Sequence, residues 1–509
     1  MITVMEYHLI NIYQAFIYII TNPLNMGVLI LASFIGLLAG ATPGITSVAI
    51  TAILLPFTIW LPPETAIIAL VAAYASAVYG GSVSAVLFRI PGSTENIMTA
   101  LDGYELTKAG RSGFALMLSR FYSFLGGLVG GLITLFLTPI LADVAVMFGP
   151  SEMFALVVMA ISFLATFEGG VKAVISALLG FFLATIGSDP VTGVYRFTFG
   201  VTILGGGFDL VAVLLGIFAI SEVLRLLESE LRFEVVKERY KFRELMFPSK
   251  ELFLRLAPPV FLIAAPIGWL IGFLPGVGAT TAAVVAYLMA RRFSKNPEKW
   301  GTGIPEGVAV PETANNAAAM GTLVPTLALG IPGGAATAIV LGALMIHGVI
   351  PGAWVFTYRA QLGYTVLVGT VLSNVVFYLL APVVIYMFLR LGEFLRRNIP
   401  FLAVMVIFFC VFGAYVIRNS VVDIIATLII GVIAYVLSRY KFPTAPMAIG
   451  FVLGPLAEKY FRRSLDIAFG NPLVFISSPI SQFIYIATAL AIVIPTLYTR
   501  LKTRKDVKS

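Results

Sequence analysis

Apolar residues fill long runs along this chain, and polar residues gather in the short segments between them. Such runs recur from end to end, for example at 24–41, 151–167, 208–221, 400–417 and 478–498. A helix needs about 20 predominantly apolar residues to cross the roughly 30 Å of hydrocarbon in a bilayer. The pattern therefore predicts an all-α polytopic membrane protein with about 10–12 membrane segments.

Two short motifs occur twice in the same order. Ile90-Pro91-Gly92 returns 241 residues later as Ile331-Pro332-Gly333, and Pro43-Gly44 returns 232 residues later as Pro275-Gly276. Further matches with nearly the same offset lie between them, so chance is a poor explanation. We therefore predict a duplication, with a first membrane repeat at 1–221 and a second at 256–475.

Charged residues of the loops indicate that the second repeat is inverted. The loop at 61–64 has no basic residue, whereas its counterpart at 291–299 has four. The loop at 108–111 has two, and its counterpart at 348–352 has none. Basic loops stay cytoplasmic, so equivalent loops lie on opposite sides, as in many secondary transporters. The basic residues of 459–463 do not fit this scheme.

A charged segment at 222–255 joins the predicted repeats, with eight basic and seven acidic residues. Its apolar residues have helical spacing, which favours a cytoplasmic linker or an interfacial helix; these residues are Val223, Leu226, Leu227 and Leu231. Residues 476–509 are predicted to add one further span and a basic cytoplasmic tail.

The Pro-Gly motifs lie inside apolar segments and predict broken helices. Residues 256–290 begin and end beside basic loops, so a hairpin with Pro275-Gly276 at its tip is the simplest solution. Residues 24–60 would form its mirror image around Pro43-Gly44, and 64–103 would be a span followed by a discontinuous or re-entrant piece. Irregular backbone is tolerated at membrane depth only where protein buries it or water lines it. The four breaks therefore predict a central polar site.

Composition agrees with a membrane protein. Hydrophobic residues make up 59% of the chain, charged residues 11%, and mean hydropathy is +0.99. The net charge of +8 is explained by basic cytoplasmic loops, so it does not indicate nucleic acid. Cys410 is the single cysteine, which excludes an intrachain disulfide, and two histidines are too few for a His-rich metal site. No basic residue precedes Arg89, so a cleavable signal peptide is not expected.

Hydroxyls, amides and freed carbonyls at the breaks are hard oxygen ligands that suit an alkali cation, and half-helix N-termini suit an anion. The candidate solute-binding residues are Thr42, Pro43, Gly44, Ser82, Pro91, Gly92, Ser93, Pro275, Gly276, Asn315, Asn316, Pro332, Gly333 and Gly334. The candidate coupling-ion ligands are Thr46, Ser47, Thr280, Thr281, Thr322 and Thr337. Small and hydroxyl residues also pack membrane helices together, which is the simpler explanation for any single one of them.

Ionisable residues near the breaks are further candidates. Glu64, Glu95 and Asp102 lie near inferred segment ends, where functional and interfacial roles are equally plausible. Arg89 could pair with a solute carboxylate or extend to the headgroups, and a structural role is favoured for His347. No acid stands clearly at mid-membrane within the motifs, which favours Na⁺ over H⁺; no transition-metal site or other cofactor is expected.

The motifs resemble the large membrane subunit of the tripartite tricarboxylate transporters, the TctA-type protein. The matching stretches cover essentially the whole chain, with Ala353-Trp354 as a small departure where a proline would be expected. They are GLLAGATPGITS at 36–47, YGGSVSAVLFRIPG at 79–92, TALDGYELTKAGRSGFAL at 99–116, GFLPGVGATTA at 272–282 and PETANNAAAMGTLVPTLALGIPGGAATAIVLGALMIHGVIPG at 311–352.

The resemblance implies a solute:cation symporter of a bacterial or archaeal cytoplasmic membrane that takes up carboxylates such as citrate with Na⁺ or H⁺. It also implies a small membrane subunit and an extracytoplasmic solute-binding protein as partners, and alternating access as the mechanism. A passive channel for organic anions stays open as an alternative. A membrane-embedded enzyme would need paired aspartates, an HExxH helix or a Ser/His pair, and no such motif is visible in the sequence.

Overall fold

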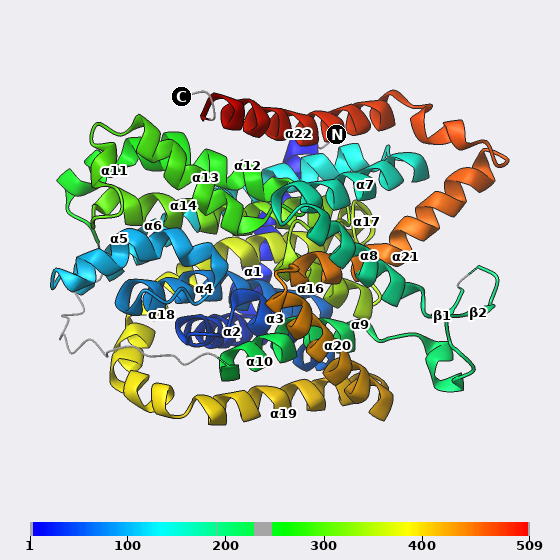
Figure 1. Cartoon of the computed structure of the whole chain (residues 1–509), viewed down its shortest axis with the longest axis horizontal. Helices are drawn as coiled ribbons and strands as arrows, with labels where there is room; N and C mark the ends of the chain where they lie inside the picture. Colours follow the sequence, from blue (N-terminus) through cyan, green and yellow to red (C-terminus); the bar gives the residue numbers. More distant parts are fainter. Residues whose placement is uncertain (1–3, 190, 229–246, 507–509) are drawn as a thin grey trace.

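The computed structural model describes residues 4–189, 191–228 and 247–506. Within these ranges the chain is almost entirely helical, and nine helices are long and apolar enough to cross a membrane. Four shorter apolar helices accompany them, at 47–60, 171–185, 335–346 and 479–493. Most of the long helices lie roughly along one direction (Figure 1). The predicted all-α, multi-span membrane fold is confirmed.

Residues 4–228 form ten α-helices, four short 3-10 or π segments and two short strands. Their bounds are α1 (Val4–Thr21), α2 (Pro23–Ala41), α3 (Ser47–Leu54), η1 (Leu55–Trp60), α4 (Pro63–Phe88), η2 (Thr94–Asn96), α5 (Ile97–Lys108), α6 (Ser112–Ala145), α7 (Pro150–Phe167), α8 (Val171–Thr185), β1 (Gly187–Ser188), β2 (Tyr195–Arg196), η3 (Thr202–Gly206), α9 (Leu210–Leu215), η4 (Gly216–Ile220) and α10 (Ser221–Glu228).

Residues 247–506 contain the other twelve α-helices and three short segments. They are α11 (Lys250–Pro259), η6 (Val260–Ala264), α12 (Ala265–Phe273), α13 (Gly278–Phe293), η7 (Pro297–Lys299), α14 (Pro305–Gly321), α15 (Leu323–Ala328), α16 (Ala335–Ile346), α17 (Trp354–Tyr358), α18 (Ala360–Arg397), α19 (Ile399–Arg418), α20 (Val421–Arg439), α21 (Thr444–Ile467), η8 (Pro472–Ile476) and α22 (Pro479–Asp506).

The charged joint at 222–255 is described only at its two ends. Residues 222–228 continue α10, where Val223 and Leu226 are buried in the protein and Leu227 is exposed. Residues 250–255 begin α11. The stretch between, with Leu231, lies outside the described residues.

Helices are broken at each of the four motifs. α2 ends before Pro43 and α12 ends before Pro275, and both turns pass through a glycine with positive φ, +88° at Gly44 and +80° at Gly276. Glycine adopts this conformation without the steric cost that a β-carbon adds. The two Ile-Pro-Gly motifs separate α4 from η2 and α15 from α16. The predicted positions of the breaks therefore agree with the structure.

Glycines hold α2 and α12, which end at the Pro-Gly motifs, tightly against a neighbouring helix. A Cβ at Gly40 on α2 would lie 2.4 Å from the Ala77 carbonyl oxygen on α4. A Cβ at Gly272 on α12 would lie 2.2 Å from the corresponding oxygen of Ala318 on α14. One helical turn earlier, Gly36 meets α4 and Gly268 meets α14 in the same way. In each pair of helices the contacting residue numbers increase together, so α2 runs parallel to α4, and α12 runs parallel to α14.

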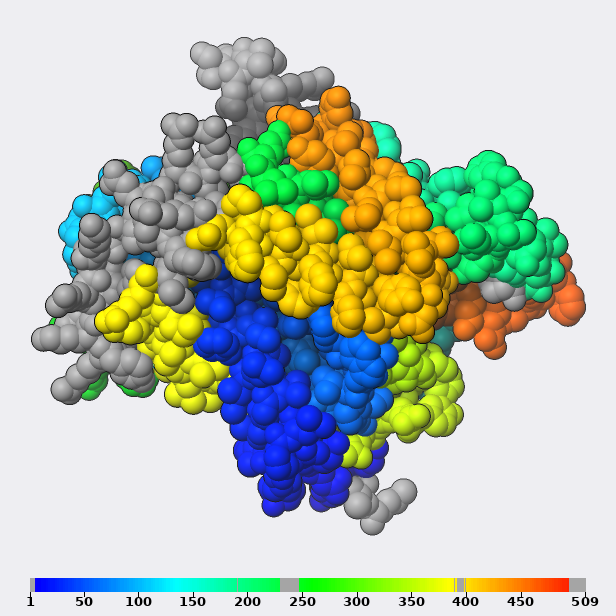
Figure 2. Space-filling model, turned by 90° about the horizontal axis from the view of Figure 1, so that it is seen from below, coloured from blue at the N-terminus to red at the C-terminus, as the bar shows by residue number. Residues whose placement is uncertain are grey.

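Burial separates core helices from peripheral ones. Every residue in the most apolar stretch of α4 is buried inside the protein. In the corresponding stretch of α19, only 22% of the residues are buried. α19 and α20 cover one face of the molecule beside the N-terminal helices (Figure 2). Exposed apolar side chains are abundant on these two helices, including Phe401, Val404, Phe408 and Ile429. Such a surface suits contact with lipid rather than water.

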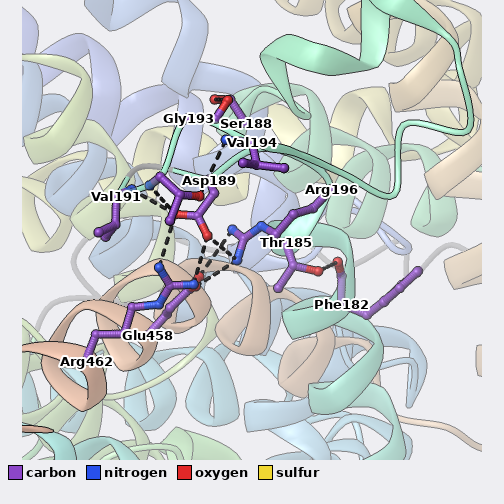
Figure 3. A network of polar contacts seen from close by, with 11 residues as sticks. Phe182, Thr185, Ser188, Asp189, Val191, Gly193, Val194, Arg196, Glu458 and Arg462 are labelled. Carbon is purple, nitrogen blue, oxygen red and sulfur yellow. Dashed lines mark hydrogen bonds and ion pairs between the residues drawn. The ribbon is translucent and has the colours of Figure 1, made fainter.

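The antiparallel strands β1 and β2 belong to a loop that projects from one end of the molecule (Figure 1). A network of charges attaches this loop to α21 (Figure 3). Arg462 lies 2.8 Å from Asp189, and Arg196 lies 2.7 Å from Glu458. Hydrogen bonds from Arg462 hold the pKa of Asp189 below the usual range of an aspartate. Arg462 is thus paired inside the fold, which explains why it does not follow the loop-charge pattern.

Candidate functional site

The four breaks meet at one place. The Ser47 amide donates to the Ser93 hydroxyl over 2.9 Å, which joins the first Pro-Gly break to the first Ile-Pro-Gly motif. The Gly276 amide donates to the Gly333 carbonyl over 3.0 Å, which joins the second pair. The hydroxyls of Thr94 and Thr280 are 2.8 Å apart and link the two pairs. Segments more than 180 residues apart in sequence therefore form a single junction.

A cavity of about 490 Å³ lies at this junction, within the size range of ligand pockets. The first residues of α3, α13 and α16 all line it. Helix N-termini carry partial positive charge and unsatisfied amide groups. Three N-termini directed to one cavity favour an anion there.

Seven of the twenty predicted site residues line this cavity. They are Thr46, Ser47, Ser93, Thr280, Thr281, Thr322 and Gly334. Five of these seven are predicted ligands of the coupling ion. The hydroxyl side chains among the seven come from both predicted repeats. The sequence thus located one wall of the cavity.

The other thirteen predicted residues do not line the cavity: Thr42, Pro43, Gly44, Ser82, Pro91, Gly92, Pro275, Gly276, Asn315, Asn316, Pro332, Gly333 and Thr337. Close backbone packing accounts for several of them. A Cβ on Gly92 would lie 2.3 Å from the Gly40 carbonyl oxygen, and one on Gly333 would lie 2.5 Å from that of Thr322. Thr337 caps the start of α16 by accepting from the Gly334 amide. These residues hold the tips in place.

Glu95 stands in the cavity wall and is only 7% exposed. One carboxylate oxygen accepts a hydrogen bond of 3.0 Å from the Ser47 hydroxyl, and the other has no hydrogen-bond partner. The Asn315 side chain donates to the backbone carbonyl of Glu95 over 3.3 Å. The sequence left Glu95 undecided between a site and a segment end; the structure places it at the junction.

Glu312 is a second buried acid, on α14, and is not among the site residues predicted from the sequence. Its carboxylate accepts hydrogen bonds from three hydroxyls, those of Ser82 at 2.7 Å, Thr99 and Ser123. Its backbone carbonyl accepts from the Asn316 side chain. An acid within the apolar stretch 308–328 was the available signal. Two buried acids therefore lie among the motifs, which removes the reason for preferring Na⁺ to H⁺ as the coupling ion.

The opposite wall comes from segments that no sequence motif connects to the site. It is formed by the end of α7, by η4 with α10, and by the turn between α20 and α21. Arg225 and Lys441 are exposed at the rim, and Arg225 lies 3.3 Å from Glu222. Arg225 was not predicted as a site residue because it lies in the charged joint, whose composition is typical of a solvated linker.

The remaining charged candidates lie elsewhere. Arg89 is exposed and 3.8 Å from Glu105, away from the cavity. Asp102 is fully buried and accepts from the Tyr287 hydroxyl and from backbone amides at 301–304, so it fixes the loop before α14. His347 ends α16, and Glu64 lies in the first turn of α4.

A second cavity, of about 370 Å³, lies on the other side of α15. Thr322 and Gly334 line the first cavity, whereas Ala328 and Leu329 line the second. The short helix α15 and the break that follows it therefore stand between the two cavities. Lys459 and Arg463 contribute positive charge to the second one.

A sequence profile described as "Tripartite tricarboxylate transporter TctA family" matches residues 26–449. The chain belongs to this family. The TctA resemblance of the motifs is thereby confirmed, and the chain is a multi-pass membrane protein of a transporter family.

Two relatives of the chain come from Agrobacterium vitis. The "Uncharacterized 52.8 kDa protein in TAR-I ttuC' 3'region" is 35% identical over 487 residues, which cover 95% of each chain. The "Uncharacterized protein in TAR-II ttuC' 3'region" is 34% identical over 241 residues, which cover 47% of this TctA chain and 97% of its own. No solved structure matches the chain.

Proposed function

We propose that this TctA chain is a cation-coupled symporter that takes up tricarboxylates or related carboxylates by alternating access. The observation that carries the proposal is the convergence of three helix N-termini on a cavity rimmed by Arg225 and Lys441. Backbone amides and basic side chains recognise carboxylates. Hydroxyls beside them supply oxygen ligands for Na⁺, and Glu95 can carry H⁺.

The matched breaks support an inverted repeat. Each Pro-Gly tip contacts its own Ile-Pro-Gly motif, and each broken helix runs parallel to its glycine-packed partner. The number of basic residues differs between equivalent loops, as expected when the loops face opposite sides of the membrane. The four breaks would then be re-entrant or discontinuous pieces with their tips at the bilayer centre.

The two cavities on either side of α15 support alternating access. The larger cavity opens beside α10, which leads into the charged joint, so by the loop-charge rule it faces the cytoplasm. The smaller cavity would then lie on the extracytoplasmic route. Its basic residues, Lys459 and Arg463, would attract an anion released there.

The partners follow from the family. A small membrane subunit and an extracytoplasmic solute-binding protein would complete the system in the cytoplasmic membrane of a bacterium or archaeon. The projecting loop at β1 and β2 lies on the proposed outer side.

Reconstitution of the complete system in proteoliposomes tests this function. A panel of carboxylates is first screened for binding to the solute-binding protein, and the one bound is then offered under an imposed Na⁺ or H⁺ gradient. We expect accumulation above the external concentration that stops when the gradient is dissipated. Equilibration without ion dependence would instead indicate the passive channel.

A further inference from the structure

The cavity wall contains a carboxylate without a balancing charge. Glu95 forms no ion pair within the described parts of the chain, and its second oxygen lacks a hydrogen-bond partner although the side chain is 7% exposed. Removing an ionised carboxylate from water is costly unless it is paired or protonated. An orphaned buried acid of this kind calls for a functional explanation.

The groups that face Glu95 are oxygen-rich and uncharged. Ser47 of α3 donates to it, the Ser93 hydroxyl also interacts with it, and Thr94, Thr280 and Thr322 line the same cavity. Tyr74 of α4 lines the same cavity, and the Asn315 side chain of α14 donates to the backbone carbonyl of Glu95. Oxygen ligands suit hard cations.

Four charged residues line the rest of the cavity: Glu168, Glu222, Arg225 and Lys441. They belong to the opposite wall and the rim, and Arg225 is already paired with Glu222. The two cationic side chains of the cavity are therefore exposed, and Glu95 is the most buried of its three carboxylates.

We propose that Glu95 is the residue that binds the coupling cation, and that one positive charge, Na⁺ or H⁺, must neutralise it before the carboxylate solute binds. This inference rests on the proposed symport and names the site of its coupling. An ionised Glu95 competes with the solute for the same helix N-termini and repels it. A neutralised Glu95 does neither.

This arrangement links the two ligands thermodynamically. If the cation raises the affinity for the solute, the solute raises the affinity for the cation by the same factor. Binding of the solute alone, or of the cation alone, is then the less favoured state. Coupling needs no direct contact between the two ligands beyond the shared cavity.

The first experiment measures cation binding without any solute. The full chain is purified with its small subunit, and its thermal stability is followed as Na⁺ replaces choline at constant ionic strength, and separately as pH falls at constant Na⁺. A bound cation stabilises the folded protein. We expect one of the two titrations to stabilise the wild type, and the responding one identifies the cation as Na⁺ or H⁺.

Glu95→Gln should abolish that response, because the amide mimics the neutralised acid and cannot carry the charge. Glu105→Gln is the matched control, since Glu105 lies outside the cavity and pairs with Lys108 on the exposed side of α5. Glu95→Asp keeps the charge, but its shorter side chain holds the carboxylate further from the cation. Its affinity for the cation should therefore be about tenfold weaker than that of the wild type. A response of Glu95→Gln equal to that of Glu105→Gln would overturn the proposal; if Glu95→Gln does not fold, an unchanged affinity in Glu95→Asp would overturn it.

Transport measurements distinguish the role of Glu95 in cation binding from the proposed symport itself. Glu95→Gln should exchange labelled solute across the membrane yet fail to accumulate it under an imposed cation gradient. Gradient-driven accumulation by Glu95→Gln would refute the role of Glu95 while symport stands. A wild type that never accumulates any carboxylate of the panel, with a cation response lost in Glu95→Gln, would refute symport while the cation site stands.

Discussion

At the residue scale, the most consequential polar side chain outside the cavity is Glu312. It accepts from hydroxyls of α4, α5 and α6, so it ties three helices to α14. A carboxylate in this position is satisfied by hydrogen bonds alone. That distinguishes it from Glu95, whose second oxygen has none.

Glu312→Ala should destabilise the protein strongly. Three buried hydroxyls would lose their acceptor, and each unsatisfied buried group costs about 1–3 kcal/mol. We expect the melting temperature in detergent to fall by several degrees. Glu306→Ala is the control on the same helix, because Glu306 pairs with the exposed Arg255, and such pairs contribute about 0–1 kcal/mol. Equal losses in the two variants would contradict the assigned role.

The sequence predicted part of the site for a clear physical reason. Ser47, Thr280 and Thr322 adjoin breaks, and broken backbone must be buried or hydrated at membrane depth. Arg225 and Lys441 escaped prediction because their approach to the breaks depends on how α10 and the α20–α21 turn pack. No local pattern encodes that packing.

At the element scale, the broken helices depend on glycine contacts. A β-carbon on Gly40 would lie 2.4 Å from a peptide oxygen of α4, closer than real Cβ contacts allow. α2 would have to move away from α4, and the tip at Pro43-Gly44 would move with it. The same holds for Gly272 and the tip at Pro275-Gly276.

Gly40→Ala should therefore lower the stability by about 1–3 kcal/mol, the usual cost of overpacking. Gly27→Ala is a matched control on the same helix, since nothing lies within 4 Å of a Cβ there. It should be neutral, or stabilising by up to about 1 kcal/mol, because alanine favours helix over glycine. Thermal unfolding of the two variants side by side gives the answer, and a Gly40→Ala variant as stable as wild type would contradict it.

At the scale of the whole molecule, the cavity separates the breaks from a wall built of α7, η4 with α10, and the α20–α21 turn. Alternating access requires these two parts to move relative to each other. Gly44 and Leu226 adjoin across this boundary: a Cβ on Gly44 would lie 3.5 Å from that of Leu226. That separation is typical of a disulfide.

The double variant Gly44→Cys/Leu226→Cys should lose solute uptake on oxidation and regain it on reduction. The native Cys410 is buried and does not compete. Each single variant, oxidised in the same way, controls for the substitution itself, including the strain of a side chain at the positive φ of Gly44. Unchanged uptake by the oxidised double variant, with the disulfide verified by mass spectrometry, would place the moving boundary elsewhere.

The helical fold and the helix breaks were predictable because hydropathy and Pro-Gly interruptions are local properties of the chain. In the part of the chain that the structure describes, nine long helices and four shorter apolar ones bracket the expected segment number. The loop at β1 and β2 was not foreseen, since its attachment depends on Asp189 meeting Arg462 from a helix about 270 residues further on.

The glycine contacts also restrict how this protein can work mechanically. Peptide oxygens of α4 fit between glycines of α2, and α14 receives α12 in the same manner, so neither pair can slide without collision. On α6, a Cβ at Gly126 would lie 2.2 Å from a backbone atom of α14, and one at Gly130 would lie 2.7 Å from another. α8 and α21 interlock through Gly180 and Gly450. The proposed transport cycle must then carry the broken helices together with their partners as large rigid blocks, and the boundary between blocks runs through the proposed solute cavity.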